Sequence, residues 1–163
     1  MRVVIRRSAQ VKPMVLEIQQ TNVHFDFKKE LDKALEIGEI SNLLFVTGMP
    51  ESAERLRVLK SYEEDMEEGH KPLSLESVKN YAEFINAFRD IEEPLLGVSP
   101  DGVLGADWKF NDGRYLGLSF EPSGQVVYAA ILPGADPENP EQMYGQGCWP
   151  DIIRTLRNRG LDR

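Results

Sequence analysis

The clearest pattern along the chain is a series of short alternating segments between residues 95 and 132, LLGVSPDGVLGADWKFNDGRYLGLSFEPSGQVVYAAIL. Apolar and polar positions alternate within most segments, as in strands that bury one face. The segments are separated by PDG, NDG and PSG, each of which supplies a glycine suited to a tight turn. These glycines stand at 102, 113 and 124, a spacing typical of successive short strands. We therefore predict an antiparallel β-meander of four or more strands.

Helical spacing precedes the meander in two stretches. The first begins near Pro50, which is tolerated in a first helical turn. Its apolar stripe consists of Leu56, Leu59, Tyr62 and Met66. The second stretch, residues 74–90, begins at the suitable N-cap Ser74 and has an apolar side broad enough to require burial. We expect this helix to cover one face of the meander, which gives an α+β fold with helices packed on one face of the sheet.

The two ends of the chain show shorter patterns. Before residue 48 they predict strands at 2–7, 14–18 and 23–27, a helix that begins at Lys28 and stops near Gly38, and a strand or packed loop at 43–46. After the meander, residues 133–147 are rich in Pro and Gly and are interpreted as a loop or ordered extension that could cover a sheet edge. A last short helix is expected from Trp149 to Gly160. We expect one α+β domain over residues 1–163.

The last strand of the meander and the glycines inside its strands have further implications. VVYAAIL, residues 126–132, is apolar on both faces, which is typical of a central or doubly covered strand. Gly105, Asp107 and Gly117 share the more polar face of the predicted sheet. The two glycines predict a β-bulge or, as the alternative, a surface that something approaches closely. This face is one candidate interaction site.

Charge narrows the possible partners. The chain has 27 acidic and 19 basic residues and a net charge of −8, which disfavours non-specific binding to nucleic acid. The excess is concentrated between residues 51 and 93, where 12 acidic residues face 6 basic ones. Such a run is usually a solvated surface, and the alternative is a surface for a basic partner. The candidate contacts for that partner are Glu64, Asp65, Glu67 and Glu68.

The number of cysteines and the length of the apolar runs indicate the cellular compartment and whether the chain crosses a membrane. The single cysteine, Cys148, excludes an intramolecular disulfide and fits a reducing cytoplasm. No apolar run approaches the roughly 20 residues that cross a bilayer. We expect a cytoplasmic protein without membrane contact.

Catalytic and cofactor motifs are sparse. The chain has two histidines, His24 and His70, and no zinc-binding spacing, P-loop, G-x-G-x-x-G or G-x-S-x-G motif. A carboxylate site for a cation is conceivable from Asp101, Asp107 and Asp112, although turn chemistry explains two of these. We therefore expect no metal and no cofactor.

Two residues keep an enzymatic alternative open. Cys148 comes just before a helix, where the helix dipole would lower its pKa, but a nucleophile would also need His24 or His70 within reach. The simpler interpretation is a semi-buried residue beside Trp149. Asp107 lies in the middle of a strand, where turn formation does not explain it. A small hydrolase or nuclease using these groups is the alternative to a binding module.

Arginines near both termini suggest a further alternative. If the ends of the chain lie together, they would form a basic patch able to contact phosphates. The residues concerned are Arg2, Arg6, Arg7, Arg154, Arg157, Arg159 and Arg163. This arrangement would make the protein a nucleic-acid-associated regulator.

Residues 62–132 resemble a known group of proteins. The order of an acidic segment, a PLSLES helix, VSPDG, a strand ending near Trp108, RYLGLSF and VVY resembles small uncharacterised bacterial proteins with a helix followed by a PDG…W…L…F…DG…Y meander. Members of that group have a tryptophan in the segment that corresponds to EEDMEEGH, where this chain has none. The resemblance implies an accessory protein of a defence or toxin–antitoxin-like operon and transfers no catalytic residue. Our leading hypothesis is a non-enzymatic protein-interaction module of antitoxin or immunity type, with a protein partner.

Overall fold

The computed structural model describes residues 25–134 and 138–162 of the chain. The predicted strands at 2–7 and 14–18 lie outside these residues. The helices are α1 (Phe27–Lys33), α2 (Ile37–Val46), α3 (Pro50–Ser61), the short 3-10 helix η1 (Tyr62–Asp65), α4 (Leu75–Ala87) and α5 (Trp149–Asn158). The strands are β1 (Leu95–Val98), β2 (Leu104–Lys109), β3 (Tyr115–Phe120), β4 (Gln125–Leu132) and β5 (Glu141–Cys148).

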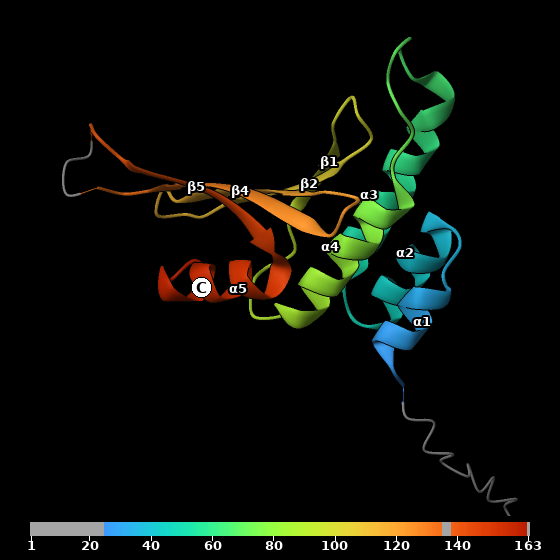
Figure 1. Ribbon diagram of the computed structural model, residues 1–163, viewed down its shortest axis with the longest axis horizontal. Helices are drawn as coiled ribbons and strands as arrows, with labels where there is room; N and C mark the ends of the chain where they lie inside the picture. Colours follow the sequence, from blue (N-terminus) through green and yellow to red (C-terminus); the bar gives the residue numbers. More distant parts are fainter. Residues whose placement is uncertain (1–24, 135–137, 163) are drawn as a thin grey trace, which may run out of the picture.

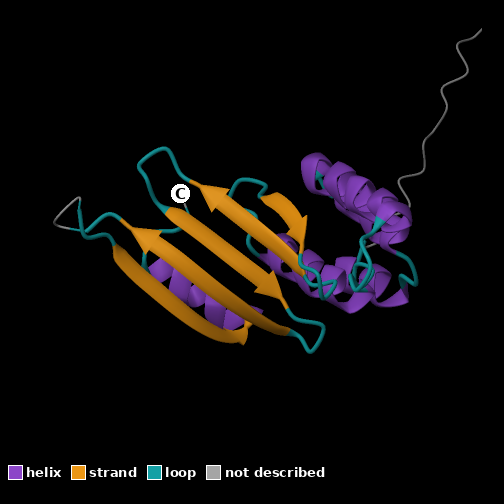
Figure 2. Cartoon of the chain, turned by 90° about the horizontal axis from the view of Figure 1, so that it is seen from above, coloured by secondary structure: helices purple, strands orange, loops and turns teal. Residues whose placement is uncertain are grey.

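The five strands form one antiparallel sheet in the order β1-β2-β3-β4-β5, so each strand pairs with its neighbour in the sequence. The predicted meander is therefore confirmed, and Gly102, Gly113 and Gly124 all adopt the positive φ that its turns require. Helices α4 and α5 lie beneath the sheet, while α1, α2 and α3 pack beside α4 (Figure 1). Among the described residues, no helix lies over the opposite face of the sheet (Figure 2).

Helix α4 forms the centre of the core. Its Ser74 side chain accepts the backbone N–H of Ser77, which confirms the predicted N-cap. The Phe84 ring packs against the rings of Phe120 and Trp108 from the covered face of the sheet, with centroids 5.3 and 6.2 Å away. This aromatic contact joins the helical layer to the sheet and confirms an α+β fold with helices on one face.

Two buried polar residues of α4 fix it to the ends of the strands. The Ser77 hydroxyl donates to the carbonyl of Phe120 over 2.5 Å and accepts the N–H of Leu104 over 2.8 Å. The Asn80 amide donates to the carbonyls of Glu121 and Gln125. These bonds satisfy backbone groups where β2, β3 and β4 meet the helix.

The first helices differ from the prediction. Phe27, assigned to a strand at 23–27, is the first residue of α1, because Asp26 caps this helix by accepting the N–H of Lys29. The single helix predicted from Lys28 to Gly38 is correct as far as Lys33 and wrong after it, since α1 ends there and a new helix starts at Ile37. A reciprocal capping box between Glu36 and Glu39 begins α2.

The same change affects the residues that follow. Gly38 lies in the first turn of α2 and does not end a helix. The apolar run 43–46 forms the last turns of α2 and is neither strand nor loop. In α3 the predicted start at Pro50 is confirmed, and Leu56 and Leu59 are buried. The prediction that Tyr62 continues the buried stripe is wrong. Tyr62 is 58% exposed, because the α-helix ends before it and a 3-10 helix begins at that residue.

The segment 133–147 contains a strand that the sequence did not predict. Residues 141–148 form β5, which pairs with β4 along its whole length. β4 is thereby an interior strand of the sheet, which agrees with the first of the two predicted alternatives, while only one of its faces is covered by described helices. Gly145 lies opposite Tyr128, whose ring occupies the space above the glycine. Pairing of this kind is a non-local interaction that a run rich in Gly and Pro does not reveal.

Candidate functional site

The uncovered side of the sheet, here called the open face, is built from the residues that alternate with the core positions. One row across all five strands consists of Leu95, Asp107, Gly117, Ala129 and Tyr144. The next row consists of Gly97, Gly105, Ser119, Val127 and Gln146. A third row, over β2 to β5, consists of Lys109, Tyr115, Ile131 and Gln142.

The open face has exposed apolar side chains towards its margins and several small residues in its middle. Tyr144 is 70% exposed and Leu95 is 63% exposed, and more than a third of the surface of Val127 and of Ile131 is exposed. Between these side chains lie Gly105, Gly117, Ser119 and Ala129, together with the polar residues Asp107, Lys109 and Tyr115. Exposed apolar side chains on a face that no described element covers are typical of a place where another molecule binds. The small central residues would allow that molecule to approach the backbone closely.

The predicted trio Gly105, Asp107 and Gly117 lies together on this face. The predicted bulge is wrong, because β2 and β3 pair without interruption through both glycines. Gly117 instead leaves room for the hydrogen bond that the Tyr115 hydroxyl donates to Asp107, since a Cβ there would lie 2.9 Å from that hydroxyl oxygen. The bond to Asp107, with smaller effects of burial and charge, raises the pKa of Tyr115 to about 12.

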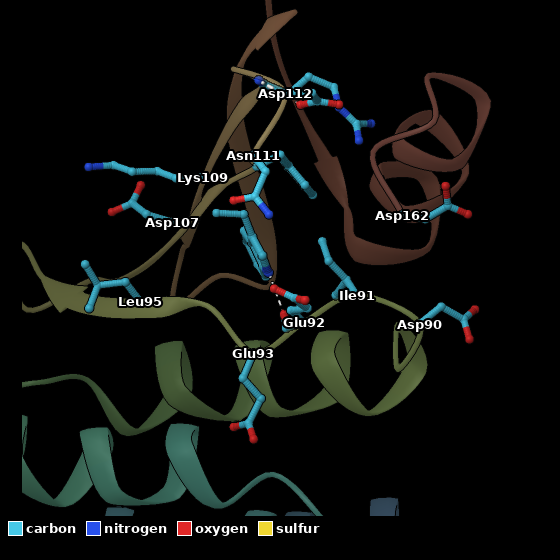
Figure 3. Close-up of a pocket in the computed structure, with 13 residues that line it drawn as sticks. Asp90, Ile91, Glu92, Glu93, Leu95, Asp107, Lys109, Asn111, Asp112 and Asp162 are labelled. Atoms are coloured by element: carbon cyan, nitrogen blue, oxygen red, sulfur yellow. Dashed lines mark hydrogen bonds and ion pairs between the residues drawn. The ribbon is translucent and has the colours of Figure 1, made fainter.

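Asp107 also borders a cleft of about 600 Å³ at the end of the β2–β3 hairpin (Figure 3). Its other side is formed by the α4–β1 connection, where the backbone carbonyl of Glu92 accepts the indole N–H of Trp108 over 2.7 Å. The volume is within the range of small-molecule sites. Six acidic residues line the cleft, and they are Asp90, Glu92, Glu93, Asp107, Asp112 and Asp162.

Most of these carboxylates have structural partners. Glu93 points away from the cleft towards α3 (Figure 3), where it accepts the backbone N–H of Ser52 over 2.6 Å. Asp90 pairs with Arg157, and Asp112 pairs with Arg114. The bond from the backbone N–H of Arg114 is the main cause that lowers the pKa of Asp112. The acidity of the cleft is therefore explained largely by contacts that hold the fold together.

Cys148 lacks the neighbours of a catalytic thiol within the described part of the chain. It is exposed at the end of β5, and its Sγ contacts Oδ2 of Asp151 at 3.0 Å. His70 lies beside β1, next to Val98 in a small hollow, and β1 and β5 are opposite edges of the sheet. His24, the other predicted partner, lies outside the described residues.

The predicted charged surfaces lie apart from the open face. Glu64, Asp65, Glu67 and Glu68 are exposed in and after η1, at the far end of α3 (Figure 1). Arg154 pairs with Asp151 at 3.4 Å, and Arg157 pairs with Asp90 at 3.5 Å. Acidic neighbours thus offset part of the positive charge expected to contact phosphates, while Arg2, Arg6 and Arg7 are outside the described residues. The nucleic-acid alternative stays a prediction.

Neither a metal cluster nor a membrane span is found in residues 25–134 and 138–162. No three His, Cys, Asp or Glu side chains converge there as a cation would require, and Asp101 instead lies near Lys71 in the β1–β2 turn. No helix in the same residues is long and apolar enough to cross a bilayer.

Sequence reasoning missed the apolar margin of the open face. A signal existed for Val127 and Ile131, because β4 is apolar on both faces, but it indicated a central or doubly covered strand. Tyr144 gave no signal, since it lies in a segment interpreted as a loop or as an ordered extension at a sheet edge, with no strand assigned. The cleft gave none either, because it depends on how the α4–β1 connection crosses the β2–β3 hairpin.

Comparison of the chain with protein-family models, with curated proteins and with solved structures gave no match.

Proposed function

We propose that this chain is a non-enzymatic protein-interaction module that binds a partner protein through the open face of its sheet. The observation that carries this proposal is the exposure of Leu95, Val127, Ile131 and Tyr144 on a face that no helix of residues 25–134 and 138–162 covers. Exposed apolar side chains lower solubility, and in many proteins such side chains are buried against a partner.

The narrower form of the proposal is an antitoxin, an immunity-type protein or another accessory protein of a defence operon. It rests on the resemblance of residues 62–132 and on the acidic run from Glu64 to Glu68, which would meet a basic partner. The open face and this acidic run are separate surfaces, so a partner that used both would wrap around the β1 side of the molecule.

Co-purification from the native host, followed by mass spectrometry and nucleic-acid staining, tests the proposal. We expect a stoichiometric protein partner that is lost from a Val127→Asp/Ile131→Asp double variant, because charges on the open face would prevent its burial. Leu35→Asp is the matched control, since Leu35 is 80% exposed away from the sheet and its variant should keep the partner. The proposal fails if the wild-type chain has no stoichiometric partner or if the double variant keeps it.

A second candidate function, a small hydrolase or nuclease, is favoured by the position of Asp107 at the cleft. A carboxylate beside a cavity of small-molecule size could act as a general base. Against this, the Asp107 carboxylate already accepts a hydrogen bond from Tyr115. A panel of ester, phosphodiester and nucleic-acid substrates compared between wild type and Asp107→Asn decides the matter. Turnover that is lost in Asp107→Asn would support the enzyme, and no turnover by the wild type would exclude it for those substrates.

A further inference from the structure

The two edge strands of the sheet, β1 and β5, differ in whether other parts of the fold contact their outer backbone groups. β1 is a short edge strand, and α3 packs against it. The outward carbonyl of Leu96 accepts a hydrogen bond from Nε of Arg55 over 2.9 Å. A side chain from α3 thereby occupies a backbone group that another strand would need for pairing.

β5, at the other edge, has backbone groups that point away from the molecule. The bond from the N–H of Glu121 to the carbonyl of Gln125 sets the phase of β4, because backbone groups alternate in direction along an antiparallel strand. Val126, Tyr128 and Ala130 must then bond to β5, through Gly147, Gly145 and Met143. The remaining residues of β5 direct their N–H and C=O groups outward, and within the described chain these backbone groups of Gln142, Tyr144 and Gln146 have no hydrogen-bond partner.

The usual protections of an edge strand are missing from β5. Between Gln142 and Cys148 the strand has no charged residue and no proline, and Tyr144 on it is the most exposed aromatic side chain of the open face. The eight-residue strand is also as long as β4, which it pairs with throughout. It is therefore a complete template for one more strand.

Charge indicates what that further strand is. Because the strand has no charge between 142 and 148, a second copy of β5 can pair with it without bringing like charges together. Residues 50–114 contain 15 acidic and 8 basic residues, a balance of −7, whereas residues 125–163 contain 5 acidic and 4 basic residues, a balance of −1. The repulsion expected between two acidic chains is thus weaker around residues 125–163, which include β5, than around residues 50–114.

We propose that β5 pairs in antiparallel fashion with β5 of a second copy of this chain. Pairing about a two-fold axis at Gly145 places Tyr144 opposite Gln146 of the second copy, and Gln142 opposite its Cys148. An axis of this kind is perpendicular to the sheet, so the open faces of both copies lie on the same side and form one continuous surface. The pairing does not depend on the proposed partner protein, since it uses an edge rather than the open face.

Sedimentation equilibrium of the purified full-length chain tests the dimer. Tyr144→Pro removes the outward N–H at position 144 and leaves intact the bonds to β4, which Met143 and Gly145 make. Tyr144→Thr is the matched control, because it removes the ring and keeps the N–H. We expect a dimer for wild type and Tyr144→Thr and at least a tenfold weaker association for Tyr144→Pro. A monomeric wild type at high micromolar concentration would overturn the proposal, as would a dimer unaffected by Tyr144→Pro.

Cross-linking provides a second test that needs no proline. In the proposed pairing, Gln142→Cys lies opposite the native Cys148 of the second copy, at the Cα separation of about 5.5 Å that suits a disulfide. Mild oxidation should link two copies through residues 142 and 148, as identified by peptide mapping. Lys109→Cys, on the open face of β2 near the opposite edge, is the control and should not link to Cys148. Equal cross-linking of both variants would indicate random collision and would contradict the pairing.

Discussion

The two faces of the sheet share one backbone and differ in every other respect. On the covered face, Phe120, Trp108 and Leu116 pack against α4 or its flanking segments and are almost fully buried. The open face instead carries glycines, small residues, exposed apolar side chains and the polar residues Asp107, Lys109 and Tyr115. Burial therefore explains the covered face completely, whereas the apolar residues of the open face do nothing for the core. The difference shows which positions the fold requires and which positions are available for binding.

The largest test of this comparison replaces one apolar residue on each face. Phe120→Ala empties a site between Tyr81 and Phe84, so we expect a loss of about 3–5 kcal/mol in the free energy of unfolding. Ile131→Ala on the open face should cost less than about 1 kcal/mol, because its side chain is more than a third exposed. Urea denaturation of both variants measures the two values. Similar losses at both positions would mean that the open face is buried in the isolated protein.

A smaller effect is expected from the polar contact under the sheet. Ser77→Ala leaves the carbonyl of Phe120 and the N–H of Leu104 without their buried partner, at a cost of roughly 1–3 kcal/mol. Ser119→Ala, on the open face, is the control and should lie within about 0.5 kcal/mol of wild type. Thermal and urea unfolding of Ser77→Ala and Ser119→Ala measures the two losses of stability. A neutral Ser77→Ala would show that water replaces the hydroxyl and that this end of the core is open to solvent.

Glycines on the two faces offer a third comparison. A Cβ at Gly145, on the covered side, would lie 2.4 Å from Cε1 of Tyr128, so Gly145→Ala should cost about 1–3 kcal/mol by overpacking. At Gly97, on the open side, nothing lies within 4 Å of the added atom, and Gly97→Ala should change stability by less than about 0.5 kcal/mol. Equilibrium unfolding checks both variants. An equal loss in the free energy of unfolding for Gly97→Ala and Gly145→Ala would contradict the difference between the two faces.

Local signals account for what the sequence predicted. Turn glycines at 102, 113 and 124 and the N-cap Ser74 act within a few residues, and the structure confirms both the hairpins and the α4 start. The break between α1 and α2 was missed because it depends on the reciprocal Glu36–Glu39 capping box, which competes with a continuous helical pattern. β5 was missed because its glycines are compatible with a strand only when β4 and Tyr128 lie beside them.

The candidate site was predicted less completely for the same reason. Alternation placed Gly105, Asp107 and Gly117 together on one face, and they do lie together. Whether that face is covered depends on where α5 and the other helices pack, and the spacing of apolar residues within a strand does not contain that information. The exposed Tyr144 and the partnership of Tyr115 with Asp107 could be recognised only from the assembled sheet.

The smallest expected effect concerns the polar pair on the open face. The hydrogen bond to Asp107 raises the pKa of Tyr115 to about 12, above the ordinary value of 10, because it is made by the neutral phenol. The stabilisation is therefore fully present below pH 10 and is lost as the pH rises from 10 to 12. Asp107→Asn should lower the pKa of Tyr115 towards 10 and flatten the pH dependence of stability over that range.

The titration of Tyr115 can be followed by tyrosinate absorbance in two backgrounds, the wild type and Asp107→Asn. In each background the absorbance of the Tyr115→Phe variant is subtracted, which removes the contribution of the other tyrosines. Among these, Tyr81 has a raised pKa because it is buried, and it contributes equally to both backgrounds. A Gly117→Ala variant sharpens the result, since its Cβ would lie 2.9 Å from the Tyr115 hydroxyl and 3.1 Å from Asp107 and should separate the pair. If the pKa of Tyr115 stays near 12 in both variants, burial rather than Asp107 sets it, and the open face is more enclosed at β3 than its small residues indicate.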